Sequence, residues 1–137
     1  MEKSEFQFEG FKINKSLFDL NKQLASSDLT INFKPSGKLD KVNSKFNLNL
    51  GVFISDQSNN LKIEVEAIGF FKFSIIDDKD LKNFLFLNAP AILFPYIRAY
   101  ISTLTTLSGI NPIVLPTLNM SRIKDDLIKE IEEVVLS

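Results

Sequence analysis

Acidic side chains are the residues of this chain whose type and spacing come nearest to those of a catalytic site. The sequence contains neither His nor Cys, which excludes Ser-His-Asp catalysis, cysteine nucleophiles and ordinary zinc sites. Carboxylate chemistry remains, and general acid and base catalysis would need two carboxyls that reach one substrate. The candidate pairs are Glu64 with Glu66, Asp77 with Asp78, Asp125 with Asp126, and Glu132 with Glu133.

These acid pairs lack the arrangement that such chemistry needs. Adjacent acids on a strand or helix point in different directions. Glu64 and Glu66 share one strand face, but Lys62 and Lys72 lie near them, as on a solvated sheet face. The five glycines are dispersed and form no phosphate-binding loop. We therefore expect no enzyme, no metal site and no cofactor.

Length and charge limit the class of protein. A chain of 137 residues is expected to form a single domain over residues 1–137. The formal net charge is -1, with basic residues scattered among acidic ones, so nucleic acid is not an expected partner. The absence of Cys fits a reducing cytosol, and the N-terminal MEKSEFQFEG has charges where a secretory signal has an apolar run. We expect a cytoplasmic protein.

The first half of the chain alternates in the way that β-strands do. Strands are predicted at residues 4–14, 28–34, 41–55 and 60–76. The last two form a long antiparallel hairpin around a polar turn at 56–60. Phe8 and Phe11 fall on opposite parities, which predicts a bulge at Gly10. Pro35 and Gly37 predict a turn that ends the second strand, and residues 16–27 stay unassigned.

The second half is helical. A short helix is predicted at 77–87, capped by Asp77 or Asp78. A longer helix is expected to begin near Leu93 or Phe94, because a proline deeper inside would break it, and to end at Gly109. Its apolar residues cover most of its circumference, so we expect it to contact its own sheet and a second subunit. A final amphipathic helix is predicted from about Ser121 to Leu136.

Residues 84–107 form a largely apolar stretch, in which Arg98 is the only charged residue. Asn88, Pro90 and Pro95 interrupt this stretch, which leaves no continuous apolar run of the length that a bilayer requires. Burial within protein is the better interpretation, and we expect no membrane insertion.

The segment Asn88 to Asn119, NAPAILFPYIRAYISTLTTLSGINPIVLPTLN, resembles the SecB family of export chaperones. In that family the counterpart of Ile92 to Tyr96 opens the long helix, and the counterpart of Leu115 to Asn119 leads into the last helix. The family's strand ending in Phe-Ser-Ile corresponds to residues 73–75. Both helical motifs occur in order and at the family's spacing.

The resemblance implies an α+β fold: a four-stranded antiparallel sheet with a long helix and a C-terminal amphipathic helix packed on one side. It further implies a homotetramer, a dimer of dimers assembled through long helices and edge strands. Such a protein holds unfolded polypeptides in apolar grooves without ATP. The motif and interface residues would be Ile92, Leu93, Phe94, Pro95, Tyr96, Tyr100 and Leu104.

Client-binding residues are expected where apolar side chains exceed what a core needs. The outer face of the fourth strand turns from polar to apolar at Ile68, and the final helix has a wide apolar stripe. Each of these residues could instead belong to the core. The candidates are Ile68, Phe70, Ile113, Leu115, Leu118, Met120, Ile123 and Leu127.

The family resemblance suggests partners besides clients. In its export branch, the SecA translocase motor docks on acidic positions that match Asp19 and Glu66, but a third such position is Lys15 here. No acidic tail follows Leu136, so holding is better supported than export of preproteins. Some family members instead serve one antitoxin of a toxin-antitoxin system, and the sequence does not separate these roles.

Two interpretations from other classes remain open. A lipid-binding protein could enclose its ligand between a curved sheet and an amphipathic helix, and it would be a monomer with a closed apolar cavity. A structural subunit would bury the same surfaces permanently in one partner. A stable tetramer that captures unfolded protein would argue against both.

Overall fold

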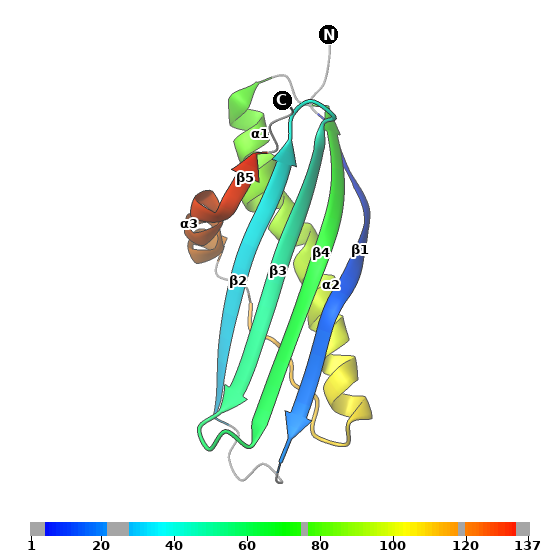
Figure 1. Cartoon of the computed structure of the whole chain (residues 1–137), viewed down its shortest axis with the longest axis vertical. Coiled ribbons are helices and arrows are strands. Elements are labelled where there is room, and N and C mark those ends of the chain that lie inside the picture. The colour runs from blue at the N-terminus through cyan, green and yellow to red at the C-terminus, as the bar shows by residue number, and fades with distance from the viewer. Residues whose placement is uncertain (1–4, 22–27, 75–76, 118–119, 134–137) are drawn as a thin grey trace.

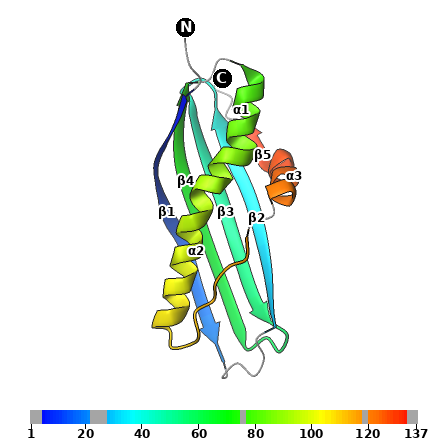
Figure 2. The same ribbon diagram turned by 180° about the vertical axis from the view of Figure 1, so that it is seen from behind.

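The computed structural model describes residues 5–21, 28–74, 77–117 and 120–133 (Figure 1). Its strands form one sheet in the order β1-β4-β3-β2-β5, and the helices lie on one side of it (Figures 1 and 2). The expected α+β architecture is thus confirmed. The elements are β1 Glu5–Leu20, β2 Leu29–Asp40, β3 Lys45–Asp56, β4 Leu61–Ser74, α1 Asp78–Asn83, the π-helical turn η1 Phe84–Asn88, α2 Ala89–Leu107, α3 Met120–Glu130 and β5 Ile131–Glu133.

The hairpin of β3 and β4 is the centre of the sheet, as its two alternating rows predict. The inner row of β3 from Phe46 to Ile54 and that of β4 from Leu61 to Phe71 are buried. Asp56 closes the turn between them, because its Oδ1 accepts the N–H of Asn60 at 2.8 Å and that of Leu61 at 3.2 Å.

Strand β1 contains the predicted bulge at Gly10 and a second one. The pairing with β4 shifts between Phe8 and Gly10 and again between Ile13 and Lys15, and Gly10 has a φ of 125°. The second bulge reverses the parity once more, so that Ser16 faces inward opposite buried Val65. The strand therefore runs to Leu20 rather than ending at residue 14.

Strand β2 corrects the turn predicted at Pro35 and Gly37, since it continues to Asp40. A proline is tolerated there because β2 is paired with β5 only at Gly37–Leu39. Gly37 is needed for packing, because a Cβ at that position would lie 2.7 Å from the ring of Phe46. The turn comes later, where Asp40 accepts the N–H of Asn43 at 3.0 Å, so β3 begins at Lys45 rather than at 41.

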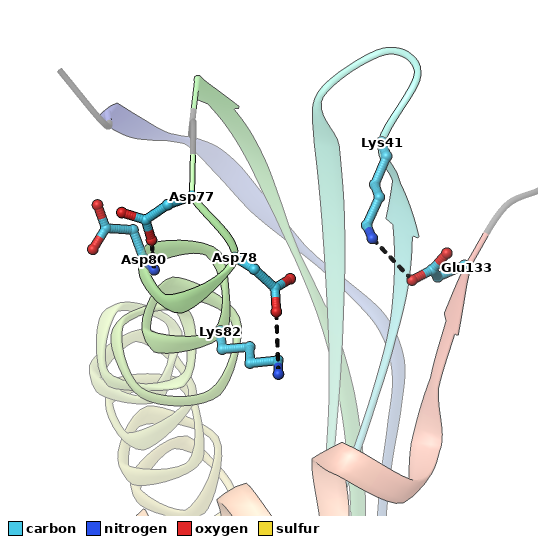
Figure 3. Close-up of polar contacts among 6 residues, drawn as sticks. All are labelled: Lys41, Asp77, Asp78, Asp80, Lys82 and Glu133. Atoms are coloured by element: carbon cyan, nitrogen blue, oxygen red, sulfur yellow. Dashed lines mark hydrogen bonds and ion pairs between the residues drawn. The ribbon is translucent and has the colours of Figure 1, made fainter. Parts of the chain in front are cut away.

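The helical segments begin earlier than predicted. Asp77 caps α1 by accepting the N–H of Asp80 at 2.8 Å (Figure 3), and α1, η1 and α2 then follow without a break. The Ala89 N–H donates to Phe84 O in the wider π turn, directly before Pro90, whose ring would crowd a regular α-helical turn. Pro95 lies inside α2 with an exposed ring. The predicted start near Leu93 is therefore wrong.

The helices are held to the sheet by close apolar packing. Leu93, Ile97 and Ile101 are fully buried, and a Cβ on Gly69 would lie 3.3 Å from the Leu93 side chain, so α2 approaches the sheet closely there. Phe84 lies among sheet aromatics, with ring centroids at 4.1 Å from Phe6, 5.7 Å from Phe71, 5.8 Å from Phe73 and 6.2 Å from Phe46.

The predicted Gly109 cap ends α2 in a Schellman motif. Gly109 has a φ of 87°, its N–H donates to Thr106 O at 3.2 Å, and the Ile110 N–H donates to Thr105 O at 3.3 Å. The loop of residues 108–117 then returns along the sheet beside α2 (Figure 2). Its Ile113 N–H donates to Thr105 Oγ1 at 2.9 Å.

The last helix is shorter than the predicted 121–136. It ends at Glu130, and Ile131–Glu133 form β5, which runs parallel to Gly37–Leu39 of β2. Lys41 and Glu133 form an ion pair at 3.4 Å across this junction (Figure 3). The open edge of β2 offers unpaired backbone groups that compete with further helix. Residues 134–136 lie outside the described residues.

Among the described residues, the continuous run Asp78–Leu107 is long and apolar enough to cross a membrane by length and composition. In its most apolar window 44% is buried inside the protein. Packing on the sheet therefore explains the apolar residues on one side of this helical run.

Candidate functional site

Two hollows among the described residues lie on either side of α3. The first, of about 220 Å³, lies between α3 on one side and β2 with the loop that precedes α3 on the other. Half-buried Ile31 and Phe33 supply apolar surface, and Arg122 and Asp126 supply charge. The ring of Phe94 packs edge-on against the ring of Phe33, with the ring centroids 5.9 Å apart. The lining residues are Ile31, Asn32, Phe33, Pro116, Thr117, Arg122, Ile123 and Asp126.

The second hollow, of about 590 Å³, lies between α3 and the segment formed by α1 and η1. Its apolar side chains are half-buried Phe86, Leu87 at 37% exposure and Ile128 at 50% exposure. Lys79, Lys82 and Lys124 contribute positive charge, and Asp78 is paired with Lys82 at 3.1 Å. Helix α3 thus has on each flank a hollow lined by both apolar and charged side chains.

The first hollow adjoins a strand edge that is open within the described residues. Strand β5 covers β2 only at Gly37–Leu39, so Leu29 to Ser36 of β2 are paired with β3 alone. Ile31 and Phe33 belong to this stretch. An extended polypeptide could pair with this edge while its side chains enter the hollow.

The predicted client-binding residues lie on two different faces. Ile113, Leu115, Ile123 and Leu127 are on the helical side and at most 8% exposed, and Ile123 also lines the first hollow. Ile68 and Phe70 are half-buried on the outer face, opposite Asn49 and Asn47 of β3. These two groups cannot line one groove. Leu118 and the side chain of Met120 lie outside what the structure describes.

Sequence reasoning missed the residues that supply much of the apolar surface of the hollows. The sequence pattern places Ile31 and Phe33 in an alternating strand and Phe86 and Leu87 in a helix, and it indicates no further role for them. The sequence does single out Ile128, because it lies beside the main apolar stripe of the final helix and widens it. In the structure its side chain is half exposed.

The outer face of the sheet carries the two acids that resemble docking positions. Asp19 lies opposite Lys62, and Glu66 lies opposite Lys15. Lys15 is 2.8 Å from Glu64, and Lys62 is 3.4 Å from the same carboxylate. The hydrogen bond from Lys15 lowers the pKa of Glu64, and the same contact raises the pKa of Lys15. Lysines therefore compensate the acids in this half of the face.

The electrostatics of Glu64 bear on one catalytic role. The hydrogen bond from Lys15 favours the ionised form of Glu64, which is unsuited to proton donation at neutral pH. Within the described ranges, no group of three acidic side chains lies close enough to hold a metal ion.

The chain matches the profile of the SecB family, described as preprotein translocase subunit SecB, over residues 8–127. The chain belongs to the SecB family. A SecB protein-export protein of Orientia tsutsugamushi (strain Boryong) is 31% identical over 123 residues, covering 87% of this chain and 74% of that protein. An uncharacterized protein of Methanocaldococcus jannaschii, MJ0357, is 39% identical over 74 residues, 53% of this chain. The match spans only 44% of the length of that relative.

A solved SecB-like structure shares the fold. The Mycobacterium tuberculosis SecB-like chaperone Rv1957, in complex with a ChAD peptide from the HigA1 antitoxin, superposes with a TM-score of 0.70 at 17% identity. The match covers 83% of this chain and 88% of that one.

The SecB motif at the start of α2 divides between core and surface. Leu93 and Phe94 are buried, whereas Pro95 is exposed. Tyr96 is 43% exposed and packs on the rings of Phe8 at 5.4 Å and Phe11 at 4.8 Å. The other interface candidates, Ile92, Tyr100 and Leu104, are half-buried, and Tyr100 Oη donates to Ser16 Oγ at 2.7 Å.

Proposed function

We propose that this SecB-family chain is the subunit of a holding chaperone that binds unfolded, extended polypeptides in the two hollows beside α3, without ATP. The observation that carries this proposal is the apolar surface of the first hollow directly beside an open stretch of β2. Apolar surface binds side chains by area, and a strand edge binds backbone. Neither interaction requires a particular client sequence.

The proposal includes a cytoplasmic homotetramer, a dimer of dimers. The side of α2 that faces away from the sheet carries the small side chains of Ala91, Pro95 and Ala99 beside that of Arg98, all exposed in the single subunit. Small side chains allow two helices to approach closely. A second copy of α2 would cover the small side chains of this side.

Two kinds of downstream partner are possible for such a chaperone: the SecA motor and an antitoxin. Lys15 stands at one docking position of the export branch and contacts Glu64, which weakens the acidic surface that SecA would use. This favours a general holding role over handover of preproteins to that motor. A chaperone dedicated to one antitoxin is the second candidate, because the solved Rv1957 complex contains an antitoxin peptide.

The lipid-binding alternative is less well supported. The hollows beside α3 open to the surface, whereas a lipid carrier would enclose its ligand in a cavity. An open hollow next to an unpaired strand edge suits a polypeptide.

The decisive experiment is size exclusion with light scattering, on the protein alone and after dilution of a chemically unfolded, reduced client into it. We expect a tetramer that captures the unfolded client and ignores its native form. Ile128→Glu should reduce capture without changing the tetramer, since Ile128 is half exposed in the second hollow. The matched control is Val42→Glu, in the turn between β2 and β3 at 68% exposure.

A monomer that captures nothing would refute the proposal. A tetramer that binds one antitoxin far more tightly than unrelated unfolded proteins would instead support the dedicated role.

A further inference from the structure

The open stretch of β2 beside the first hollow is closed at one end. Among the described residues, Leu29 to Ser36 have no partner strand on the side away from β3, whereas the next residues, Gly37–Leu39, are paired with β5. Figures 1 and 2 show β5 beside one end of β2 and no described strand beside the other. The open edge therefore has a definite end, and Pro35 lies close to it.

The backbone nitrogen of Pro35 faces this open edge. Strands β2 and β3 pair without a register shift from Leu29 to Asp40, and a proline whose nitrogen pointed at β3 would interrupt that ladder. Backbone direction alternates along a strand, so Ile31 and Phe33 face the open edge as well. Their N–H groups can donate to an added strand, whereas the ring of Pro35 fills the place of the missing hydrogen.

Strand β5 blocks the edge beyond Pro35. Ile131 lies opposite Gly37, and α3 ends immediately before it, at Glu130. An added strand that continued along the edge would therefore meet the backbone at the junction of α3 and β5. The pairing of β5 also shows that this edge accepts an added strand.

We propose that Pro35 and β5 limit the length of client backbone that the edge of β2 binds, so that pairing stops at Lys34. This inference rests on the proposed holding function and deepens it. Within Leu29–Lys34, Ile31 and Phe33 line the first hollow and also face the edge with their backbone. A client is therefore bound over a short span, with apolar side chains favoured at the two alternate positions opposite these residues.

A short span affects which clients are bound. A long open edge would pair with any chain that forms a long strand, including the strands of aggregating proteins. With pairing limited to Leu29–Lys34, a client forms few backbone hydrogen bonds and depends on its side chains in the hollow for the rest of its affinity. Beyond this span, it gains affinity only from contacts elsewhere on the protein.

The test uses the full-length protein and fluorescence anisotropy with labelled peptides. The core peptide has five residues, with leucine at its second and fourth positions between threonines. Two longer peptides carry four further threonines, at the N-terminal end or at the C-terminal end of the core. With the wild-type chain, we expect at least one extension to change the affinity by less than about twofold, because the end that runs toward Pro35 gains no backbone pairing.

Removing both features should lengthen the site in one direction. Pro35→Val restores a backbone donor, and Glu132→Pro removes one from the middle of β5 and weakens its pairing with β2. In the double variant, we expect the extension that was ineffective to strengthen binding by about threefold or more, the ratio for one or two further backbone hydrogen bonds. Pro35→Val alone should give a smaller gain, because β5 still covers Gly37.

Matched variants control for each change. Glu132→Ala keeps the backbone donor of β5 and should leave both extensions as they are in the wild-type chain. Pro112→Val makes the same exchange as Pro35→Val in the exposed part of the loop before α3, and it should change no affinity by more than about twofold. Circular dichroism verifies that each variant folds, and Pro35→Val alone decides by the same criterion if the double variant does not.

Capture of a chemically unfolded client separates this inference from the proposed function. The inference is overturned, with the holding function intact, if the wild-type chain captures the client but both extensions strengthen peptide binding. It is likewise overturned if the double variant gains nothing from either extension. A chain that captures no client and binds no peptide refutes the proposed function, and this inference with it.

Discussion

Thr105 is a buried polar residue that connects a helix to the loop that follows it. Its Oγ1 accepts the N–H of Ile113 at 2.9 Å and lies 2.9 Å from Ile101 O, to which it can donate. Thr105→Val would keep the shape but leave a buried N–H without a partner, at a cost of about 1–3 kcal/mol in the free energy of unfolding. Urea denaturation measures this loss, and hydrogen exchange at the Ile113 amide should quicken.

The matched control is Thr106→Val, where an exposed hydroxyl donates to Ser102 O at 2.7 Å. We expect this change to lie within about 0.5 kcal/mol of zero. Equal effects at both positions would show that the hydroxyl of Thr105 does not secure the loop.

The contact between Lys15 and Glu64 makes the stability of the protein depend on pH. Because the pKa of Glu64 is lowered in the folded protein, its contribution to stability is present above the unfolded pKa of glutamate and is lost as pH falls through the folded pKa. Lys15→Met should raise the pKa of Glu64 toward its ordinary value, with a smaller effect left from Lys62. Titration of the carboxyl carbon by NMR measures the shift, and an unchanged pKa would assign the effect to Lys62.

Sequence patterns identified apolar residues but not which surface each one serves. The stripe of the final helix contains both buried Leu127 and half-exposed Ile128, and helical spacing alone does not tell a core position from the wall of a hollow. Ile68 and Phe70 were correctly read as the apolar end of an outer face. Their distance from the final helix follows from which face the helices cover, and that depends on tertiary packing.

At the scale of elements, Gly37 is a case in which tertiary packing outweighs a local turn pattern, since β2 continues through it to Asp40. Gly37→Ala would place a Cβ 2.7 Å from Phe46, so we expect a loss of about 1–3 kcal/mol from overpacking. Thermal unfolding compares it with Ser36→Ala, its neighbour in β2 on the other face, which should be nearly neutral. A neutral Gly37→Ala would mean that Phe46 moves aside freely.

The elements that sequence reasoning misplaced share one physical cause. By its local chemistry, Pro95 predicts the start of a helix and Pro35 the end of a strand, since proline removes a backbone donor. In the folded protein Pro95 sits on the exposed side of α2 and Pro35 lies in a strand with little pairing on one side. Strand β5 had no local signal, because its pairing depends on the distant edge of β2.

At the scale of the whole molecule, the proposed tetramer depends on the exposed side of α2. Ala99→Glu would place a charge in a contact between helices and should shift the assembly to dimers or monomers. Light scattering after size exclusion measures the mass, with Ser58→Glu in the turn between β3 and β4 as the control. An unchanged mass for Ala99→Glu would place the subunit contact on another surface.

The overall architecture was predictable where patterns are long. The alternation of β3 and β4 and the SecB motif of α2 together specify a sheet with helices on one side, because extended periodicity leaves few ways to bury an apolar face. The hollows were less predictable, since they arise where three separate elements meet.

The order of the strands has a consequence for how the chain folds during its synthesis. Strand β1 is made first, yet it pairs only with β4 among the described strands, after β2 and β3 have been synthesised. Until then Phe6, Phe8 and Phe18 leave the ribosome without the surface that covers them, and contacts so distant along the chain form slowly. Each new subunit of this family member is thus, for a few seconds of translation, the kind of polypeptide that it is proposed to bind.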